Sequence, residues 1–213
     1  MRGRDIKRYG YEWAGLYLIA TFPSRHYDIE MFPAVKAHLL SFGIKRLEQT
    51  GKTHIVNEEK VKARKKTNNK WFETQDSISY WEDFNKPKII WKRVGSILRF
   101  SYNDDGALGL DSTCFATGEN IEFICCVLNS AMGRFLLKDA PKTGTGDLLI
   151  SVQAVEPIKV PIITKEQNSI FEDSLKELTH YSSTQKEKEI NYKVFELYNL
   201  SHDEQQYIES NFI

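Results

Sequence analysis

The sequence has few of the residues that build disulfide frameworks or metal centres. It contains three cysteines, Cys114, Cys125 and Cys126, and five histidines that occur singly along the chain. A disulfide framework needs several paired cysteines, and a zinc site needs closely spaced Cys or His ligands. The adjacent pair Cys125-Cys126 lies in an apolar run, where small buried thiols are common. We therefore expect neither a disulfide scaffold nor a metal site.

Long apolar runs are missing as well. No stretch approaches the roughly eighteen apolar residues of a membrane span, and the N-terminal residues 1–5 lack the apolar segment of a signal peptide. With 213 residues, 41% of them hydrophobic, the chain can form one large domain or two small ones with a buried core. We expect a soluble, cytoplasmic protein with no membrane partner.

The signatures of common enzyme sites are also absent. We find no dinucleotide-binding Gly-x-Gly-x-x-Gly, no phosphate-binding loop, no Gly-x-Ser-x-Gly and no His-Glu-x-x-His. The loop Thr143-Gly144-Thr145-Gly146 could hold a phosphate through its amides, but a flexible turn fits it better. Asp104, Asp105 and Asp111 could bind a nuclease metal, but Asn-Asp-Asp-Gly between two strands favours a hairpin turn. We expect this chain to have no catalytic residues.

Net charge is zero overall, but the charges are unevenly distributed. Residues 164–213 hold ten acidic residues and five lysines, so residues 1–163 carry a net charge of +5. Residues 58–70 hold six cations and two acids, and residues 84–103 hold five cations and no acid. Such clusters are typical of a surface that binds a polyanion, although a solvated face is the alternative for either cluster alone.

Hydrophobic patterning predicts an α+β fold: a β-rich target-recognition body, a long amphipathic helix and a helical C-terminal part. Residues 12–22 favour a strand, and Pro33 begins a helix over residues 33–50. Residues 52–70, which are basic and have no apolar period, indicate a loop or a mobile helix turn. Further strands are predicted in 88–94, 97–104 and 112–118, followed by a helix capped by Asn120 over 120–140. Residues 148–162 favour an edge strand or an extended connection. Capping boxes at Thr164–Gln167 and Ser201–Glu204 help to predict three helices after residue 163.

Cations and aromatic residues alternate in the middle of the chain, as in Trp91-Lys92-Arg93 and Arg99-Phe100. Lys and Arg neutralise phosphates, and Arg also reads guanine, so such a surface suits nucleic acid. The alternative is that the aromatic residues form the core while the cations merely point outward. Both interpretations hold together if buried rings leave the neighbouring cations on a rigid surface.

Several short motifs resemble a known family when they are taken in order. They are "GRDIKRYG" at 3–10, "FPAVKAHLLSF" at 32–42, "KWFE" at 70–73, "KPKIIWKRV" at 86–94, "FSYND" at 100–104, "VLNSAMGRFLL" at 127–137 and "KVFELYNLSHDE" at 193–204. The set is similar to the TaqI-like C-terminal specificity domain, the target recognition domain of type IIG restriction-modification enzymes and related adenine-specific DNA methyltransferases. The resemblance covers nearly the whole chain.

The resemblance implies that the chain grips double-stranded DNA and reads its sequence, while a methyltransferase domain of the same parent chain methylates adenine at N6. The chain has no Asn-Pro-Pro-Tyr/Phe motif and no glycine-rich S-adenosylmethionine loop. We therefore expect a non-catalytic fragment without a cofactor of its own. S-adenosylmethionine, and Mg²⁺ for any cleavage by a fused endonuclease, would belong to the missing catalytic parts.

We expect a DNA target recognition body over residues 1–163 and a C-terminal helical segment, 164–213, packed on it. In this body Ile89 and Ile90 would be buried, and the basic segment 58–70 would lie where the family varies. The alternative function is a protein–protein interaction module of a multi-subunit methyltransferase or restriction complex, which docks through helix 33–50 or the acidic tail. The predicted DNA contacts are Lys62, Arg64, Lys65, Lys66, Lys70, Lys92, Arg93 and Arg99, with Thr143 and Thr145 as weaker candidates.

Overall fold

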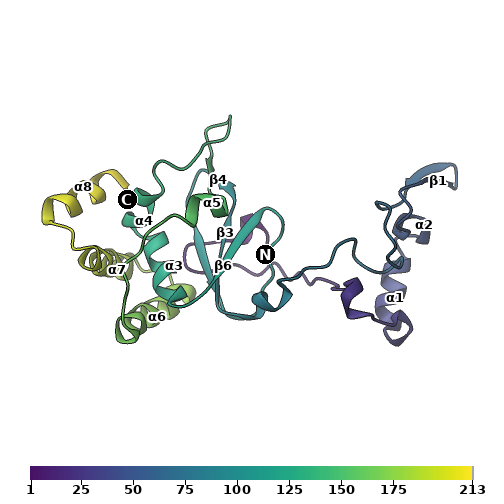
Figure 1. Cartoon of the computed structure of the whole chain (residues 1–213), viewed down its shortest axis with the longest axis horizontal. Helices are drawn as coiled ribbons and strands as arrows, with labels where there is room; N and C mark the ends of the chain where they lie inside the picture. The colour runs from purple at the N-terminus through teal and green to yellow at the C-terminus, as the bar shows by residue number, and fades with distance from the viewer. Residues whose placement is uncertain (213) are drawn as a thin grey trace. The chain divides into compact units, whose positions relative to one another are not determined.

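The computed structural model describes residues 1–212, and their contacts divide the chain into two compact units. Unit 1 combines Met1–Ala14 with the chain from Glu82 onward, and unit 2 is Gly15–Trp81 (Figure 1). Unit 2 is thus an insertion in the sequence of unit 1. The chain divides near residues 15 and 81, and not at residue 163 as the sequence suggested. The fold class is α+β, as predicted.

A three-stranded antiparallel sheet forms the centre of unit 1. β3 (Lys88–Lys92) lies between β5 (Phe100–Asn103) and β6 (Thr113–Thr117), so that Ile89 faces Tyr102 on one side and Ala116 on the other. These strands confirm the predictions for the region. The turn at residues 103–106 begins the connection from β5 to β6, which extends to residue 112. The two strands do not pair with each other, so the expected hairpin is wrong. The chain instead crosses from one edge of the sheet to the other.

Two helices follow the sheet where one was predicted. α3 (Ile121–Asn129) contacts β3 and β5, and α4 (Ala131–Leu136) begins after Ser130, whose hydroxyl accepts a hydrogen bond from the Gly133 amide. Gly133 permits this tight junction, because a Cβ atom there would lie 2.3 Å from the Val127 carbonyl oxygen. Asn120 precedes α3 in a left-handed conformation and gives no side-chain cap, contrary to the prediction.

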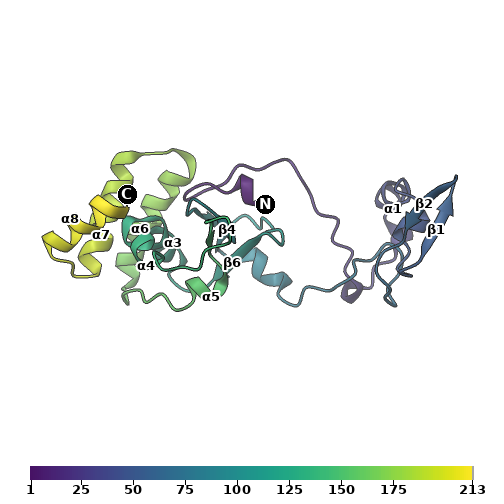
Figure 2. The same cartoon turned by 90° about the horizontal axis from the view of Figure 1, so that it is seen from above.

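The three predicted C-terminal helices are present, and they belong to the core of unit 1. They are α6 (Lys165–His180), α7 (Thr184–Leu197) and α8 (His202–Phe212), which lie around α3 and α4 (Figure 2). Both capping boxes form at their predicted residues. The helices bury an apolar set that shares one core with the sheet: Phe171, Leu175, Leu178, Ile190, Val194, Phe195 and Ile208.

The N-terminal segment completes the sheet of unit 1. The Tyr9 amide donates to the Phe100 carbonyl oxygen (2.9 Å), and the Tyr102 amide donates to that of Tyr9 (2.8 Å). Arg8 then ties this segment to the helices, because its guanidinium contacts Glu187 (2.6 Å) and the Asn129 carbonyl oxygen (2.8 Å). The remaining elements of unit 1 are short: η1 (Gly3–Asp5), η4 (Trp81–Asn85, across the unit boundary), β4 (Val94–Gly95), β7 (Leu148–Leu149) and α5 (Val152–Val155).

Unit 2 differs most from the sequence-based expectations. Residues 12–22 form no strand although their composition favours one, because no neighbouring strand pairs with them. The helix expected over 33–50 is instead two short helices, α1 (Pro33–Leu40) and α2 (Ile44–Leu47), separated at Gly43, which has a φ of 86°. Neither helix buries a residue. Two 3₁₀ turns precede them, η2 (Pro23–Arg25) and η3 (Ile29–Met31).

The segment read as a basic loop contains a hairpin. β1 (Thr53–Val56) pairs antiparallel with β2 (Glu59–Lys62) through a turn at Asn57 and Glu58, both of which have positive φ. α2 packs against β2. Over residues 1–212, no helix combines the length and apolar character needed to cross a membrane.

Candidate nucleic-acid interface

The β1–β2 hairpin presents one basic face to solvent. Successive side chains of a strand alternate between its two faces, and the half-buried His54 and Val61 mark the inner one. The opposite face therefore carries Lys60 and Lys62, paired across the hairpin with Ile55 and Thr53. Figure 2 shows β1 and β2 as a two-stranded ribbon at the edge of unit 2.

The basic segment that follows the hairpin is fixed by main-chain contacts. The Ala63 amide donates to the Lys52 carbonyl oxygen (2.9 Å), and the Gly51 amide donates to that of Arg64 (2.8 Å). These bonds continue the pairing of the two strands past their formal ends. Lys65, Lys66 and Lys70 are exposed just beyond this point. Their positions are therefore set by the hairpin, not by a free loop.

Arg64 has an internal role that the sequence did not suggest. Its Nε donates to the Leu47 carbonyl oxygen (2.9 Å), and its Nη2 donates to that of Trp71 (2.6 Å). The side chain is partly buried, and this burial lowers the pKa of its guanidinium. Because the fork is committed to two backbone carbonyls, we remove Arg64 from the proposed phosphate contacts and treat it as a clamp of unit 2.

Gln49 is the second clamp, in a unit with only a small apolar core. Its side chain is buried, and its amide group donates to the carbonyl oxygens of Lys70 (3.0 Å) and Glu73 (2.9 Å). The hydroxyl of Thr67 donates to its side-chain oxygen (2.7 Å). The few buried apolar side chains of unit 2 are Phe22, Ile29, Ala63 and Phe72. Polar contacts thus hold the basic segment where apolar packing is scarce.

The two units carry net charges of opposite sign. Unit 2 contains eleven Lys and Arg against seven Asp and Glu, a net charge of +4, so unit 1 carries −4. Among residues 1–212, no carboxylate forms an ion pair with Lys62, Lys65 or Lys66. These cations are exposed and available to a polyanion. The electrostatic footprint is therefore strongest on the inserted unit.

Unit 1 holds a second, smaller group of the predicted residues. Lys92, at the end of β3, and Arg99 line the same small hollow, and Arg93 follows Lys92 directly; all three are exposed. The hydrocarbon stem of Lys92 covers Gly3, where a Cβ atom would lie 3.0 Å from the Lys92 Cγ. The Arg93 carbonyl accepts a hydrogen bond from the Ile150 amide (2.8 Å), which brings the strand β7 beside it.

Thr143 and Thr145 lie in the turn that leads into β7. Their hydroxyl oxygens are 2.8 Å apart, and that of Thr145 lies 3.4 Å from an Asp147 carboxylate oxygen. The Gly146 amide donates to the Thr143 carbonyl oxygen (2.9 Å), as in a turn, and is not free to bind a phosphate. With a carboxylate in the turn and that amide already used, these threonines are the weakest members of the predicted set.

The four cations of residues 86–93 lie in different environments. Lys88 is fully buried at the start of β3, where its amine donates to the Phe84 carbonyl oxygen (2.7 Å), and burial lowers its pKa. Lys86 pairs with Asp83 (2.7 Å). Ile89, Ile90 and Trp91 are buried, as expected for the strand. Only Lys92 and Arg93 remain as contacts for a partner.

Two exposed cations on or next to the hairpin were missing from the predicted set. Lys60 lies on the outer face of the hairpin beside Lys62, and Lys52 lies at the end of the extended pairing. The alternation in Thr53–Val56 and Glu59–Lys62 was the available signal. It was hidden because the turn between them contains Asn-Glu and lacks the glycine that usually marks a two-residue hairpin.

No family model matches the chain, and neither does any curated protein sequence. Within residues 1–212, no group of three or more His, Cys, Asp and Glu side chains is arranged to hold a metal ion.

Proposed function

We propose that this chain is the sequence-specific double-stranded DNA recognition domain of a type IIG-like restriction-modification enzyme, and that it is itself non-catalytic. In this proposal a methyltransferase domain of the same parent chain binds S-adenosylmethionine and methylates adenine. The observation that carries the proposal is the exposed basic face of unit 2, formed by Lys60 and Lys62 on the hairpin and by Lys65 and Lys66 after it.

The form of this surface supports duplex DNA as the polyanion. The major groove of B-DNA accepts a two-stranded β-ribbon as well as a helix. A ribbon inserted there would present Lys60 and Lys62 to base edges or to the flanking phosphates. Lys65, Lys66 and Lys70 would lie along the backbone, where they would fix orientation without reading sequence. The clamps at Gln49 and Arg64 keep this surface rigid before DNA arrives.

The group around β3 is the second proposed contact. Lys92, Arg93 and Arg99 lie in unit 1, whose net charge is negative, so they form a local basic area in otherwise acidic surroundings. We expect these residues to touch phosphates only. Their loss should weaken binding equally for all DNA sequences.

The first test is fluorescence anisotropy of the chain with a random duplex DNA pool over a salt series, followed by sequencing of the bound fraction. The informative variant is Lys65→Glu with Lys66→Glu. Each phosphate contact contributes about 0.9 to the slope of log affinity against log salt, so losing two should flatten the slope by about 2 and weaken binding about tenfold.

The matched control is Lys165→Glu with Lys188→Glu, which changes the charge equally on exposed positions of the C-terminal helices. The control should retain both affinity and slope. If the two double variants behave alike, binding reflects total charge and the proposed surface is wrong. An enriched motif in the bound pool would support sequence-specific recognition, and unspecific binding would mean that base reading needs the catalytic domain.

A protein-interaction function is the second candidate, because unit 2 also exposes apolar side chains. Met31 is 74% exposed and Phe42 is 52% exposed. Phe32, which directly precedes α1, Leu40 at the end of α1 and Ile44 at the start of α2 are also exposed. The affinity of an apolar interface of this kind would not depend on salt, whereas affinity for phosphates falls as the salt concentration rises. Absence of DNA binding even at low salt would therefore favour this second function.

A further inference from the structure

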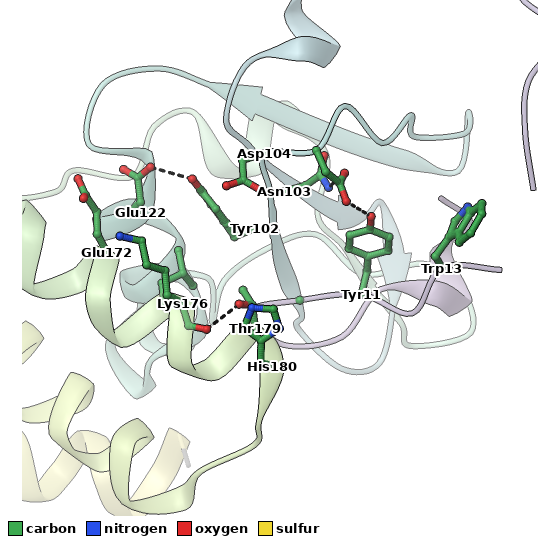
Figure 3. Close-up of a pocket in the computed structure, with 13 residues that line it drawn as sticks. Tyr11, Trp13, Tyr102, Asn103, Asp104, Glu122, Glu172, Lys176, Thr179 and His180 are labelled. Carbon is green, nitrogen blue, oxygen red and sulfur yellow. Dashed lines mark hydrogen bonds between the residues drawn. The ribbon is translucent and has the colours of Figure 1, made fainter. Parts of the chain in front are cut away.

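Unit 1 contains a cavity far richer in acidic groups than a DNA-binding surface would be. Its volume is about 420 Å³, within the range typical of small-molecule sites, and its walls come from the N-terminal segment, β5, α3 and α6 (Figure 3). Its lining includes four carboxylates, Asp104, Asp105, Glu122 and Glu172, with Lys176 and His180 as the only basic side chains.

At one end of the cavity, two carboxylates are held close together. The side-chain amide of Asn168 donates to Glu172 (2.7 Å) and, over 3.4 Å, to Glu122. The Tyr102 hydroxyl also donates to Glu122 (3.0 Å), and burial together with this carboxylate raises the pKa of Tyr102. The donors fix both carboxylates but supply no positive charge to balance them.

Lys176 can balance at most one of the two carboxylates at this end. It lies one turn after Glu172 on α6, and Figure 3 shows its side chain beside Glu172. Its amine pairs with Asp173, outside the cavity lining, at 3.8 Å, and both of these side chains are largely exposed. Such a pair is weak in water and can rearrange at little cost. The carboxylate end therefore retains an excess of negative charge.

Aromatic side chains line the rest of the cavity. Tyr11 donates its hydroxyl hydrogen to Asp105, so its ring is held in place, and Tyr102 and Trp13 also form part of the lining. Figure 3 shows Tyr11 and Trp13 at the opposite end from Glu122 and Glu172. The buried Leu175 adds an apolar surface. Aromatic faces attract organic cations, and the apolar wall accommodates methylene groups.

We propose that this cavity binds an aliphatic ammonium ion, with the cationic group at Glu122 and Glu172 and the methylene chain along Tyr102 and Tyr11. The ammonium chemistry is shared by free polyamines and by the lysine side chain of a partner protein. A phosphate group is excluded by the four carboxylates. The proposal is independent of DNA recognition, since every residue that lines the cavity belongs to unit 1 and none belongs to the basic face of unit 2.

Isothermal titration calorimetry of the full chain at low salt tests this site with two probes. They are spermidine and Nα-acetyl-lysine methylamide, whose side-chain amine is free. The informative variant is Glu122→Gln with Glu172→Gln, which keeps the shape of both side chains and removes both charges. We expect it to weaken binding at least about tenfold. The matched control, Glu156→Gln with Glu196→Gln, neutralises two exposed carboxylates that do not line the cavity and should change binding less than about twofold.

The outcomes separate the sources of the ligand. Tighter binding of spermidine identifies a free polyamine, and equal or tighter binding of the lysine derivative identifies a partner's side chain; either supports the site. The proposal is overturned if neither probe binds below about 10 mM, or if the control variant weakens binding as much as the cavity variant. Thermal melts of both variants verify that the fold is intact, and Tyr102→Phe provides a second test that leaves both carboxylates in place.

Discussion

Gln49 and Thr67 are joined by two hydrogen bonds, one through the main chain and one through the side chains. The Thr67 amide donates to the Gln49 carbonyl oxygen (3.1 Å), and the Thr67 hydroxyl donates to the Gln49 side-chain oxygen (2.7 Å). Thr67 directly follows the exposed Lys65 and Lys66. The contact therefore connects the buried centre of unit 2 with the cations that we propose to touch DNA.

Gln49→Ala should loosen the basic segment. It leaves the Lys70 and Glu73 carbonyl oxygens and the Thr67 hydroxyl without their partner, at a cost of about 1–3 kcal/mol for each group that stays buried. We expect faster hydrogen exchange at the amides of residues 63–70 and weaker DNA binding. Gln75→Ala is the control in the same unit, because no described residue hydrogen-bonds to the Gln75 side chain. Equal exchange in the two variants would contradict the clamp.

Arg64→Lys should separate the structural role of Arg64 from its charge. A lysine keeps the charge but lacks the fork that spans the Leu47 and Trp71 carbonyl oxygens, so one of them loses its donor. We expect a loss of about 1–3 kcal/mol in the stability of unit 2, followed by hydrogen exchange, and an unchanged salt slope of DNA binding. Lys65→Arg should leave both quantities as they are. A flatter slope for Arg64→Lys would return Arg64 to the contact set.

Asn129→Asp should make the stability of unit 1 depend on pH. The Asn129 amide donates to the Phe100 and Cys125 carbonyl oxygens, and its oxygen accepts from the Phe100 amide. A buried carboxylate facing two carbonyls has a raised pKa, so the folded variant holds its proton more tightly than the unfolded chain. Its destabilisation should be smallest at acidic pH and grow as pH rises through the folded pKa. Urea unfolding of Asn129→Leu, in contrast, should show a pH-independent loss.

Asp5→Asn tests the opposite pH dependence, a stabilisation that is lost as pH falls. Hydrogen bonds from the side chain and the backbone amide of Arg2 lower the pKa of Asp5 to about 2. The stabilisation by the charged form is complete above the unfolded pKa of about 3.9 and disappears as pH falls toward 2. We expect Asp5→Asn to be less stable than wild type at pH 7, with the two urea midpoints converging in acid. A constant gap would show that Asp5 acts without its charge.

The C-terminal helices could be predicted because their signals are local. Thr164 and Gln167 satisfy each other's backbone amides within one turn, and Phe171, Leu175 and Leu178 recur at helical spacing. Residues 12–22 have an equally clear composition for a strand, but a strand exists only where another one pairs with it. That partner is a property of the whole fold, and no local pattern encodes it.

The candidate site was predictable in charge but not in role. The basic stretch 58–70 correctly indicated exposed lysines, but Arg64 and Lys65 were both predicted to contact DNA. Their difference depends on the Leu47 and Trp71 carbonyl oxygens, which only the folded backbone brings to Arg64. The cavity of unit 1 was unpredictable for the same reason, because Glu122 and Glu172 meet through Asn168 across two helices.

The insertion of unit 2 also sets the order in which the chain can fold as it is synthesised. Ile6 and Tyr9 are buried, and Tyr9 bonds to Phe100 and Tyr102, which leave the ribosome only after all of unit 2. The inserted unit can therefore complete its own contacts first, while the segment before it still exposes apolar side chains. A pause in translation between residues 82 and 100 would prolong the exposure of Ile6 and Tyr9 and with it the time in which this segment can aggregate.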